Sequence, residues 1–285
     1  MNQISLARQV QIVALLTEGM SIWSIHRLTG IHRDTISRLG LTLGHACDRL
    51  HNMLFRDLHV PLIQLDEQHA FIHTRQKNRR PDDPEEYGDA WLWLAFDPAS
   101  KVVLSYHAGK RTADDAEVLV RDLHGRLLNR PQLNSDGFRA YADAIATVFG
   151  PQSVDYGMIV KDANFEKQAV FGDPDLEQIS TSLLERVNLT TRMQLRRHAR
   201  RTNAHSKRLL YHRAAIALHF AVYHLCRVHM TLRVTPAMEL QVTDHVWSIG
   251  ELIETAQANR LPDPVPSPRQ PPRLRVIQGG KSRTA

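Results

Sequence analysis

The sequence predicts an α/β fold, a mixed five-stranded sheet flanked by helices, preceded by a small helical module. Two observations indicate this class. Apolar residues recur with the helical period over residues 6–44. From residue 61 onward, short runs rich in β-branched and aromatic residues alternate with helical stretches. Alternation of this kind is typical of layered α/β proteins.

The composition is that of a globular protein with a basic surface. The chain has 285 residues, of which 42% are hydrophobic and 23% charged, and its formal net charge is +6. A chain of this length buries one large core and still carries a small additional module. The basic balance favours a polyanionic partner such as nucleic acid.

Cysteine content and hydropathy indicate a cytoplasmic protein without membrane association. Cys47 and Cys226 are too few for a disulfide framework or a four-cysteine zinc module, which fits a reducing compartment. The first residues lack the apolar core of a signal peptide, and no run approaches the roughly 18 apolar residues that span a bilayer. We expect the protein on the nucleoid if its basic surface binds DNA.

Residues 6–44 predict three short helices in a helix-turn-helix arrangement. Gly19 ends the first helix, Ser21 caps the second, and Gly30 ends the second. The third helix opens with exposed polar residues, as does the helix that enters the DNA major groove in this motif. We therefore assign residues 1–45 to a DNA-binding module, and the alternative is a helical bundle for dimerisation. The candidate DNA contacts are His32, Arg33, Thr35 and Arg38.

Three strands follow a connecting segment, a helix or linker over residues 46–60. They are expected over residues 61–73, 90–97 and 101–109, and a polar loop separates the first two. The turn residues 98–100 join the last two strands. These short returns predict an antiparallel meander.

Helices and strands alternate through the rest of the core. A helix capped by Thr112 leads to a strand over 131–136, then to a second helix and a strand over 154–161. A long basic helix begins near Ser182. The predicted order is therefore three strands, a helix, a strand, a helix, a strand and further helices. This is the order of the ribonuclease-H-like fold, which we expect over residues 61–238.

The C-terminal part predicts helices and then a tail. Residues 239–260 are expected to form one or two helices. Residues 261–285 are rich in proline and basic residues without an apolar period, which predicts a disordered tail. The tryptophans are expected to fill cores. Histidines 205, 212 and 219 are expected to be structural, because their spacing matches no usual zinc pattern.

Three acidic residues stand where a metal-dependent site needs carboxylates. Asp66 lies inside an apolar strand, where an unpaired charge is costly and a metal would compensate it. Glu67 points to the opposite face of that strand, so both acids cannot line one site. Asp136 ends a strand, where ligands bind in α/β sheets, and Glu185 begins the basic helix.

These acids match the requirements of phosphodiester chemistry on DNA. That chemistry uses divalent ions held by a few carboxylates, together with water and substrate oxygens. Asp66, Asp136 and Glu185 are therefore the candidate catalytic residues and metal ligands. The structural alternatives are a buried hydrogen-bonded aspartate, a turn residue and a first-turn acid favoured by the helix dipole.

The stretch after Glu185 is basic, with no acidic residue before Glu239. Charges of one sign repel one another unless an anion neutralises them, and DNA phosphates are the natural candidate. On the predicted helix, a spacing of three and four places Glu185, Asn188 and Arg192 on one face. The expected DNA contacts here are Asn188, Arg192, Arg196, Arg197, Arg200, Arg201 and Lys207.

Three blocks of the sequence resemble the catalytic blocks of insertion-sequence transposases, most closely the family founded by insertion sequence one. They are LDEQ around Asp66, LNSDGFRAY around Asp136, and SLLERVNLTTRMQLRRHARRTNAHSK around Glu185. The resemblance implies a ribonuclease-H-like DDE core in which these three acids bind Mg²⁺, with Mn²⁺ as a substitute. It also implies cleavage of double-stranded DNA at element ends and strand transfer into target DNA. Two ends are joined to one target, so a homo-oligomer of at least two copies is expected.

The sequence departs from that family in one respect and leaves two alternatives open. Family members often carry a cysteine zinc finger ahead of the helix-turn-helix, and this sequence has none. One alternative is a domesticated helix-turn-helix DNA-binding regulator with a vestigial core. The other is a ribonuclease-H-like nuclease that hydrolyses DNA without strand transfer.

Overall fold

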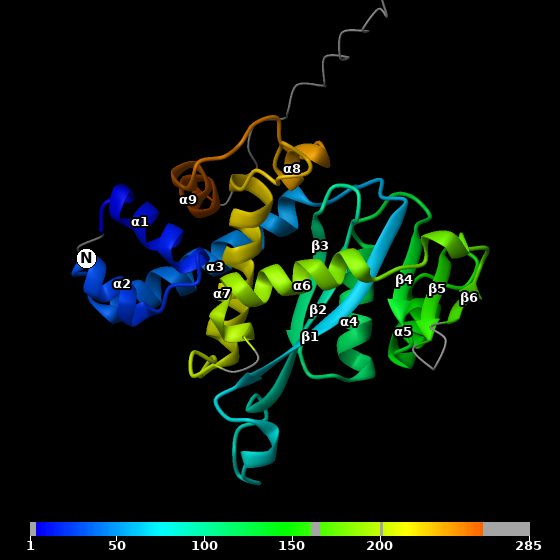
Figure 1. Ribbon diagram of the computed structural model, residues 1–285, viewed down its shortest axis with the longest axis horizontal. Coiled ribbons are helices and arrows are strands. Elements are labelled where there is room, and N and C mark those ends of the chain that lie inside the picture. Colours follow the sequence, from blue (N-terminus) through cyan, green and yellow to red (C-terminus); the bar gives the residue numbers. More distant parts are fainter. Residues whose placement is uncertain (1–3, 161–165, 200–201, 259–285) are drawn as a thin grey trace, which may run out of the picture.

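A central sheet with helices on both faces forms the body of the molecule (Figure 1). The computed structural model describes residues 4–160, 166–199 and 202–258. The predicted tail, residues 261–285, lies outside the described residues. The N-terminal helices lie to one side of the sheet, and the hairpin between the first two strands projects from it (Figure 1).

The sheet has six strands over the described residues, in the order β3-β2-β1-β4-β5-β6. β1, β2 and β3 form the predicted antiparallel meander, whereas β4 pairs parallel with β1 and β5 pairs parallel with β4. The strands are β1 (Leu62–Ile72), β2 (Gly88–Phe96), β3 (Val103–Gly109), β4 (Gln132–Asp136), β5 (Asp155–Val160) and β6 (Glu166–Phe171).

The expectation of five strands is wrong by one, because β6 pairs antiparallel with β5. No strand was predicted between residue 161 and the basic helix that begins near Ser182. Its first residues, Glu166 and Lys167, are exposed charged side chains, and no residue of the strand is fully buried. Charged residues of this kind are common on sheet edges, where they oppose further strand pairing. An edge strand without a buried face leaves no apolar run in the sequence to reveal it.

Alternating residues of the strands divide the core into two layers. On one face, Leu65 and Trp93 pack with apolar residues of α4 (Ala113–His124) and α5 (Arg139–Val148). On the other face, Leu94 packs with apolar residues of α6 (Ser182–Gln194) and α7 (Leu209–Ala221). The period of two along each strand thus separates the two helical layers.

The long basic helix expected from Ser182 is interrupted after α6. Leu195 has extended backbone angles, φ −101° and ψ 91°, and one 3₁₀ turn over Arg196–His198 follows. Leu195 and His198 are both buried. The break places these two side chains in the interior, and tertiary packing of this kind overrides helical propensity.

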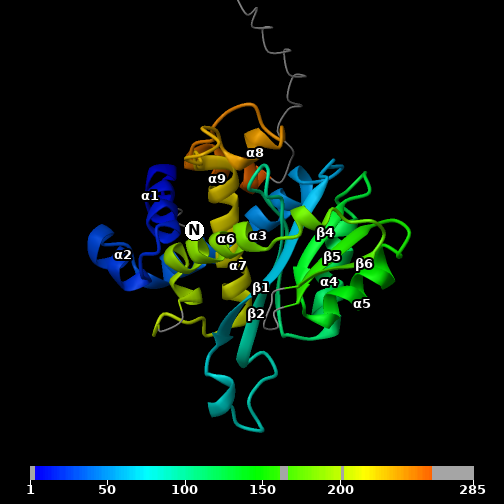
Figure 2. The same cartoon turned by 45° about the vertical axis from the view of Figure 1, so that its right-hand side comes forward.

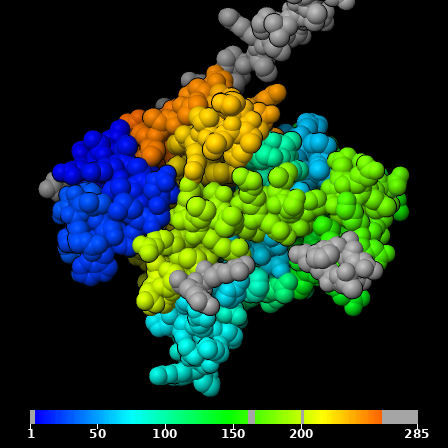
Figure 3. All heavy atoms as spheres, viewed as in Figure 1, coloured from blue at the N-terminus to red at the C-terminus, as the bar shows by residue number. Residues whose placement is uncertain are grey.

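The three predicted N-terminal helices are α1 (Leu6–Thr17), α2 (Ile22–Thr29) and α3 (Arg33–Leu54). Ile12, Ile25 and Ile36, one from each helix, share a small core and are fully buried. In the space-filling view these helices form a lobe beside α6 and α7 (Figure 3). α3 continues without a break past residue 45, so the predicted domain boundary there stays a prediction.

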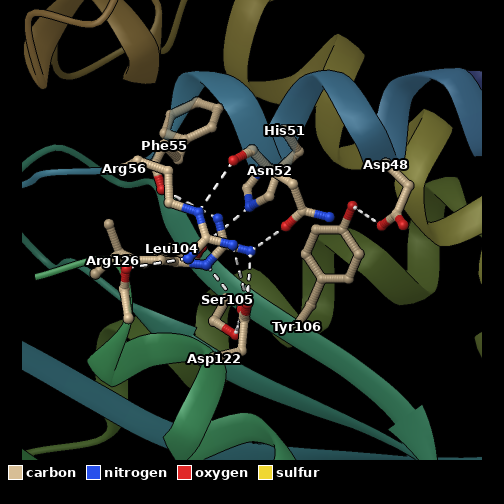
Figure 4. A network of polar contacts seen from close by, with 11 residues as sticks. Asp48, His51, Asn52, Phe55, Arg56, Leu104, Ser105, Tyr106, Asp122 and Arg126 are labelled. Atoms are coloured by element: carbon tan, nitrogen blue, oxygen red, sulfur yellow. Dashed lines mark hydrogen bonds and ion pairs between the residues drawn. The ribbon is translucent and has the colours of Figure 1, made fainter.

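The second half of α3 is bonded to the sheet and to α4 through a buried arginine (Figure 4). Arg126 donates to the carbonyl oxygen of Phe55 over 3.0 Å, to Asp122 Oδ2 over 2.7 Å, and to Asn52 Oδ1. One turn earlier, His51 Nε2 donates to the carbonyl oxygen of Leu104 on β3 over 3.0 Å. This half of α3 is therefore an integral part of the core.

The C-terminal part contributes α8 (Pro236–Glu239) and α9 (Ile249–Ala258). α9 packs against α1 and α3, and its buried residues Leu252 and Ile253 join the main core. Cys47 and Cys226 are both free thiols. Among the helices in the described parts of the chain, none is long and apolar enough to cross a membrane.

Candidate active site

Two of the three predicted acids lie on neighbouring strands and on the same face of the sheet. Gln64 of β1 pairs with Asn134 of β4, and the Asn134 side chain donates to the carbonyl oxygen of Gln178, ahead of α6, while the Gln64 side chain accepts from Leu184 in the first turn of α6. Two residues further along each parallel strand, Asp66 and Asp136 lie on that same face. The pairing between β1 and β4 ends at Gln64 and Asn134, so both aspartates lie just beyond it, at the carboxyl end of β4, where ligands bind in α/β sheets. We call this strand-end region with its two aspartates the acidic crevice.

α6 crosses over β1 (Figures 1 and 2), and polar contacts with alternate residues of β1 hold it there. Gln64 Oε1 accepts from the backbone N–H of Leu184 over 2.9 Å, and Gln68 Nε2 donates to the carbonyl oxygen of Asn188 over 2.7 Å. Between them, Asp66 Oδ2 accepts from Asn188 Nδ2 over 2.7 Å. Asn188, predicted to contact DNA, is buried and orients Asp66.

Glu185 lies in the first turn of α6 and is exposed. Its neighbours in the helix, Leu184 and Asn188, both bond to β1, so the backbone of this turn lies above the crevice. Within the part of the chain that the structure describes, no three His, Cys, Asp or Glu side chains form a group that holds a metal ion. Asp66 and Asp136 lie on adjacent strands and on one face of the sheet, and the joint participation of Asp66, Asp136 and Glu185 in one site stays a prediction.

Glu67 lies on the opposite face from Asp66, as strand alternation predicts, yet it is electrostatically linked to the site. Its Oε1 accepts from Arg111 Nε over 2.8 Å, and its Oε2 accepts from Tyr141 Oη over 3.1 Å. Burial raises the pKa of Glu67, and the charge of Asp136 raises this pKa further, while Arg111 and Tyr141 lower it. Strand alternation excluded Glu67 from the site of Asp66, and neither Arg111 nor Tyr141 was predicted as a partner of Glu67.

Tyr141 has a buried hydroxyl group that donates to Glu67 and is influenced by the charges of two further carboxylates. Burial raises the pKa of Tyr141 well above its usual value, and the charges of Glu67, Asp66 and Asp136 raise it further. The Tyr141 side chain is fully buried, and its ring packs edge-on against those of Trp93 and Phe138. This tyrosine belongs to the LNSDGFRAY block, so the sequence contained the signal. The negative potential here favours a cation.

Arg111 offsets part of this negative charge from the edge of the site. Its guanidinium group lies 2.6 Å from Glu67 Oε1 and 4.1 Å from the centre of the Phe138 ring. It also lies 4.9 Å from the centre of the Trp91 ring. An arginine held between two aromatic rings keeps its charge in a defined place.

The predicted DNA contacts of the N-terminal helices lie around the start of α3. His32 is its exposed N-cap residue, Arg38 is exposed, and Thr35 is partly exposed. The Arg33 guanidinium lies 3.8 Å from the centre of the Trp23 ring, which is 55% exposed. The expectation that Trp23 fills a core is therefore wrong, because it stacks with Arg33 on the surface.

The predicted basic contacts after α6 are spread over several segments. Arg196 and Lys207 are exposed, Arg192 is partly buried in the last turn of α6, and Arg197 Nη1 donates to Ser206 Oγ over 2.9 Å. Arg200 and Arg201 lie outside the described residues. The interruption of the helix at Leu195 places Arg196, Arg197 and Lys207 beside the N-terminal helices, where the same cavity borders both.

Comparisons with known proteins give similarities at the level of structure. No model of a known protein family matches the chain, and no curated protein matches it. The chain is similar to a piggyBac transposase in a synaptic complex with hairpin DNA, with TM-score 0.46 and 12% identity over 88% of this chain and 69% of that one. It is also similar to the Mos1 transposase in a paired-end complex with the left transposon end, with TM-score 0.25 and 13% identity over 77% of each chain.

A further similar structure is the Mos1 mariner paired-end complex with Mn. Its TM-score is 0.21, with 14% identity over 52% of this chain and 58% of that one. The solved structures named here are all transposases, and they do not include a member of the insertion-sequence-one family.

Proposed function

We propose that this chain is a DNA transposase that cleaves DNA at the ends of an insertion element and transfers the strand into target DNA. The observation that carries the proposal is the position of Asp66 and Asp136 on one face of two adjacent parallel strands, with α6 bonded to Asp66 through Asn188. The strand order supports a ribonuclease-H-like core extended by β6. The three sequence blocks favour the insertion-sequence-one family of DDE transposases.

The residues of the crevice fit a divalent cation. Mg²⁺ and Mn²⁺ take a few carboxylates and fill their remaining positions with water and substrate oxygens, so Asp66 and Asp136 supply a suitable donor pair. When bound, such ions would activate the attacking oxygen and stabilise the leaving oxygen. Asn188 orients Asp66, and Arg111 offsets the charge of Glu67. In this proposal the exposed Glu185 side chain turns toward the aspartates when DNA lies along α6.

The N-terminal helices supply the DNA-binding module of the proposal. Between α2 and α3, Gly30 has φ 70°, and His26 Nδ1 lies 2.8 Å from the carbonyl oxygen of Ile31, which fixes a tight turn. This turn supports a helix-turn-helix in which the first turns of α3 enter the major groove. The exposed Arg196 and Lys207 would bind phosphates. We expect double-stranded DNA as partner, an assembly of at least two copies, and a location on the nucleoid.

A cleavage and strand-transfer assay tests the proposal. The full chain is incubated with Mg²⁺ or Mn²⁺ and with labelled DNA from the flanks of its gene, where inverted repeats are expected. The variants Asp66→Asn, Asp136→Asn and Glu185→Gln should each lose at least about a hundredfold in joined product, because each removes a charge proposed to bind the metal. The matched controls Asp143→Asn and Glu254→Gln change exposed acids on other helices and should behave like the unaltered chain.

The outcomes separate the alternatives. Normal joining by all three variants would overturn the site assignment. Metal-dependent hydrolysis without joined products would replace the proposal by a nuclease. Binding to the flanking DNA without any metal-dependent cleavage would replace it by a regulator with a vestigial core.

A further inference from the structure

A cavity of about 400 Å³ lies between the N-terminal helices and the segment that joins α6 to α7. It shares no residue with the acidic crevice, so the proposed chemistry does not account for it. Its wall is largely aliphatic, with side chains from α1, α3, α7 and the end of α6. The apolar residues that define it best are Leu16, Met20, Ile36, Leu41, Leu195 and Leu218.

The charge around this cavity has one sign. Arg196, Arg197, Lys207 and Arg208 all line it, and none of the residues that line it is Asp or Glu. Arg197 is partly buried whereas the other three are exposed, and its guanidinium donates to Ser206 Oγ. Burial lowers the pKa of Arg197. A partly desolvated guanidinium beside an apolar wall favours an anion that brings its own apolar body.

We infer that this cavity binds a small amphipathic anion, with an apolar body inside and a carboxylate, sulfonate or phosphate group against the arginines. The volume is that of an ordinary small-molecule site. The wall contains Tyr211 and His205 but is mainly aliphatic, which favours a hydrocarbon body over a nucleobase that needs stacking partners. The inference goes beyond the proposed function and does not require it.

A pair of fluorescent probes tests the charge requirement. The full chain is titrated with anilinonaphthalene sulfonate, an apolar anion, and with N-phenylnaphthylamine, its neutral counterpart. The anion should bind at a single saturable site and about tenfold more tightly than the neutral probe, because it pairs with the arginines. The double variant Arg196→Gln, Lys207→Gln should reduce this preference to about threefold, because Arg197 and Arg208 remain. The remote variant Arg121→Gln should behave like the unaltered chain.

A cavity-filling variant tests the location. Gly40 lines the cavity from α3, and a Cβ atom there would meet one atom, Leu16 Cδ1, at an ordinary distance of 3.5 Å. Gly40→Leu should therefore fold normally and bind both probes at least about tenfold more weakly, since its side chain occupies the space. A urea unfolding curve confirms that this variant is folded.

Three results would overturn the inference. The first is unchanged binding of both probes to folded Gly40→Leu. The second is equal affinity of the unaltered chain for the charged and neutral probes. The third is displacement of the anion by an oligonucleotide with an unpaired base but not by a fully paired duplex, which would assign the cavity to a nucleobase.

Discussion

The carboxylate of Asp66 has a defined direction because the side-chain amide of Asn188, from another element, bonds to it. Asn188 Nδ2 donates to Asp66 Oδ2 over 2.7 Å, while the carbonyl oxygen of Asn188 accepts from Gln68. The first contact involves the side chain of Asn188 and the second its backbone. The two contacts can therefore be separated by mutation.

Asn188→Ala should raise the concentration of Mg²⁺ needed for half-maximal DNA cleavage by about tenfold. The variant keeps the backbone bond to Gln68 but releases the Asp66 carboxylate, and loss of a group that orients a metal ligand typically has this effect. The measurement is cleavage rate against metal concentration. Leu189→Ala, at an exposed position next in the helix, is the control. An unchanged metal requirement in a folded Asn188→Ala variant would remove Asn188 from the site.

At the scale of elements, α3 and α7 are in contact through their backbones. A Cβ atom on Gly44 would lie 2.2 Å from the carbonyl oxygen of Ala214, so only glycine fits at this crossing. A Cβ atom on Gly40, one turn earlier on the same helix, would meet only the Leu16 side chain, at an ordinary distance of 3.5 Å. The two glycines look alike in the sequence, and only the helix packing distinguishes them.

Gly44→Ala and Gly40→Ala should therefore change stability in opposite directions. The first forces α3 and α7 apart and should destabilise the protein by about 1–3 kcal/mol. The second removes backbone freedom from the unfolded chain and should stabilise it by up to about 1 kcal/mol. Urea unfolding at one pH measures both. Equal effects of the two substitutions would contradict the close approach of α3 and α7.

At the scale of the whole molecule, the interior holds several neutral histidines. Burial lowers the pKa of His51 and of His212 to about 3, and that of His219 to about 4. Burial also lowers the pKa of His198 and His224 well below 6.5. These side chains pack in the core, as the structural interpretation of the histidines expects for His212 and His219.

The protein should lose stability as the pH falls below about 6.5, the ordinary histidine value. The folded pKa values are the lower ones, so below that pH the unfolded chain binds protons that the folded chain does not. Stability is therefore complete above pH 6.5 and declines toward pH 3 to 4, by up to about 1.4 kcal/mol per pH unit for each such histidine. Urea midpoints between pH 8 and pH 5 measure this slope. A flat profile over that range would show that these histidines titrate normally.

The sequence by itself determined the order and type of most elements, because apolar periods and caps act locally. The caps at Ser21 and Thr112 and the alternation that separates Asp66 from Glu67 are of this kind. The positions of Asp66 within an apolar strand and of Asp136 at the end of a strand also predicted them as candidate catalytic residues. Such local signals predict which side of a helix or strand is apolar, but not which other element that side packs against.

The tertiary structure alone decided which residues meet. Asn188 and Arg192 share a predicted face, yet packing of α6 on β1 buries Asn188 against Asp66. The break at Leu195, the exposure of Trp23 and the edge strand β6 likewise follow from contacts with distant segments. The free energy that settles these choices comes from contacts between residues far apart in the chain. The apolar periodicity within one segment does not predict those contacts.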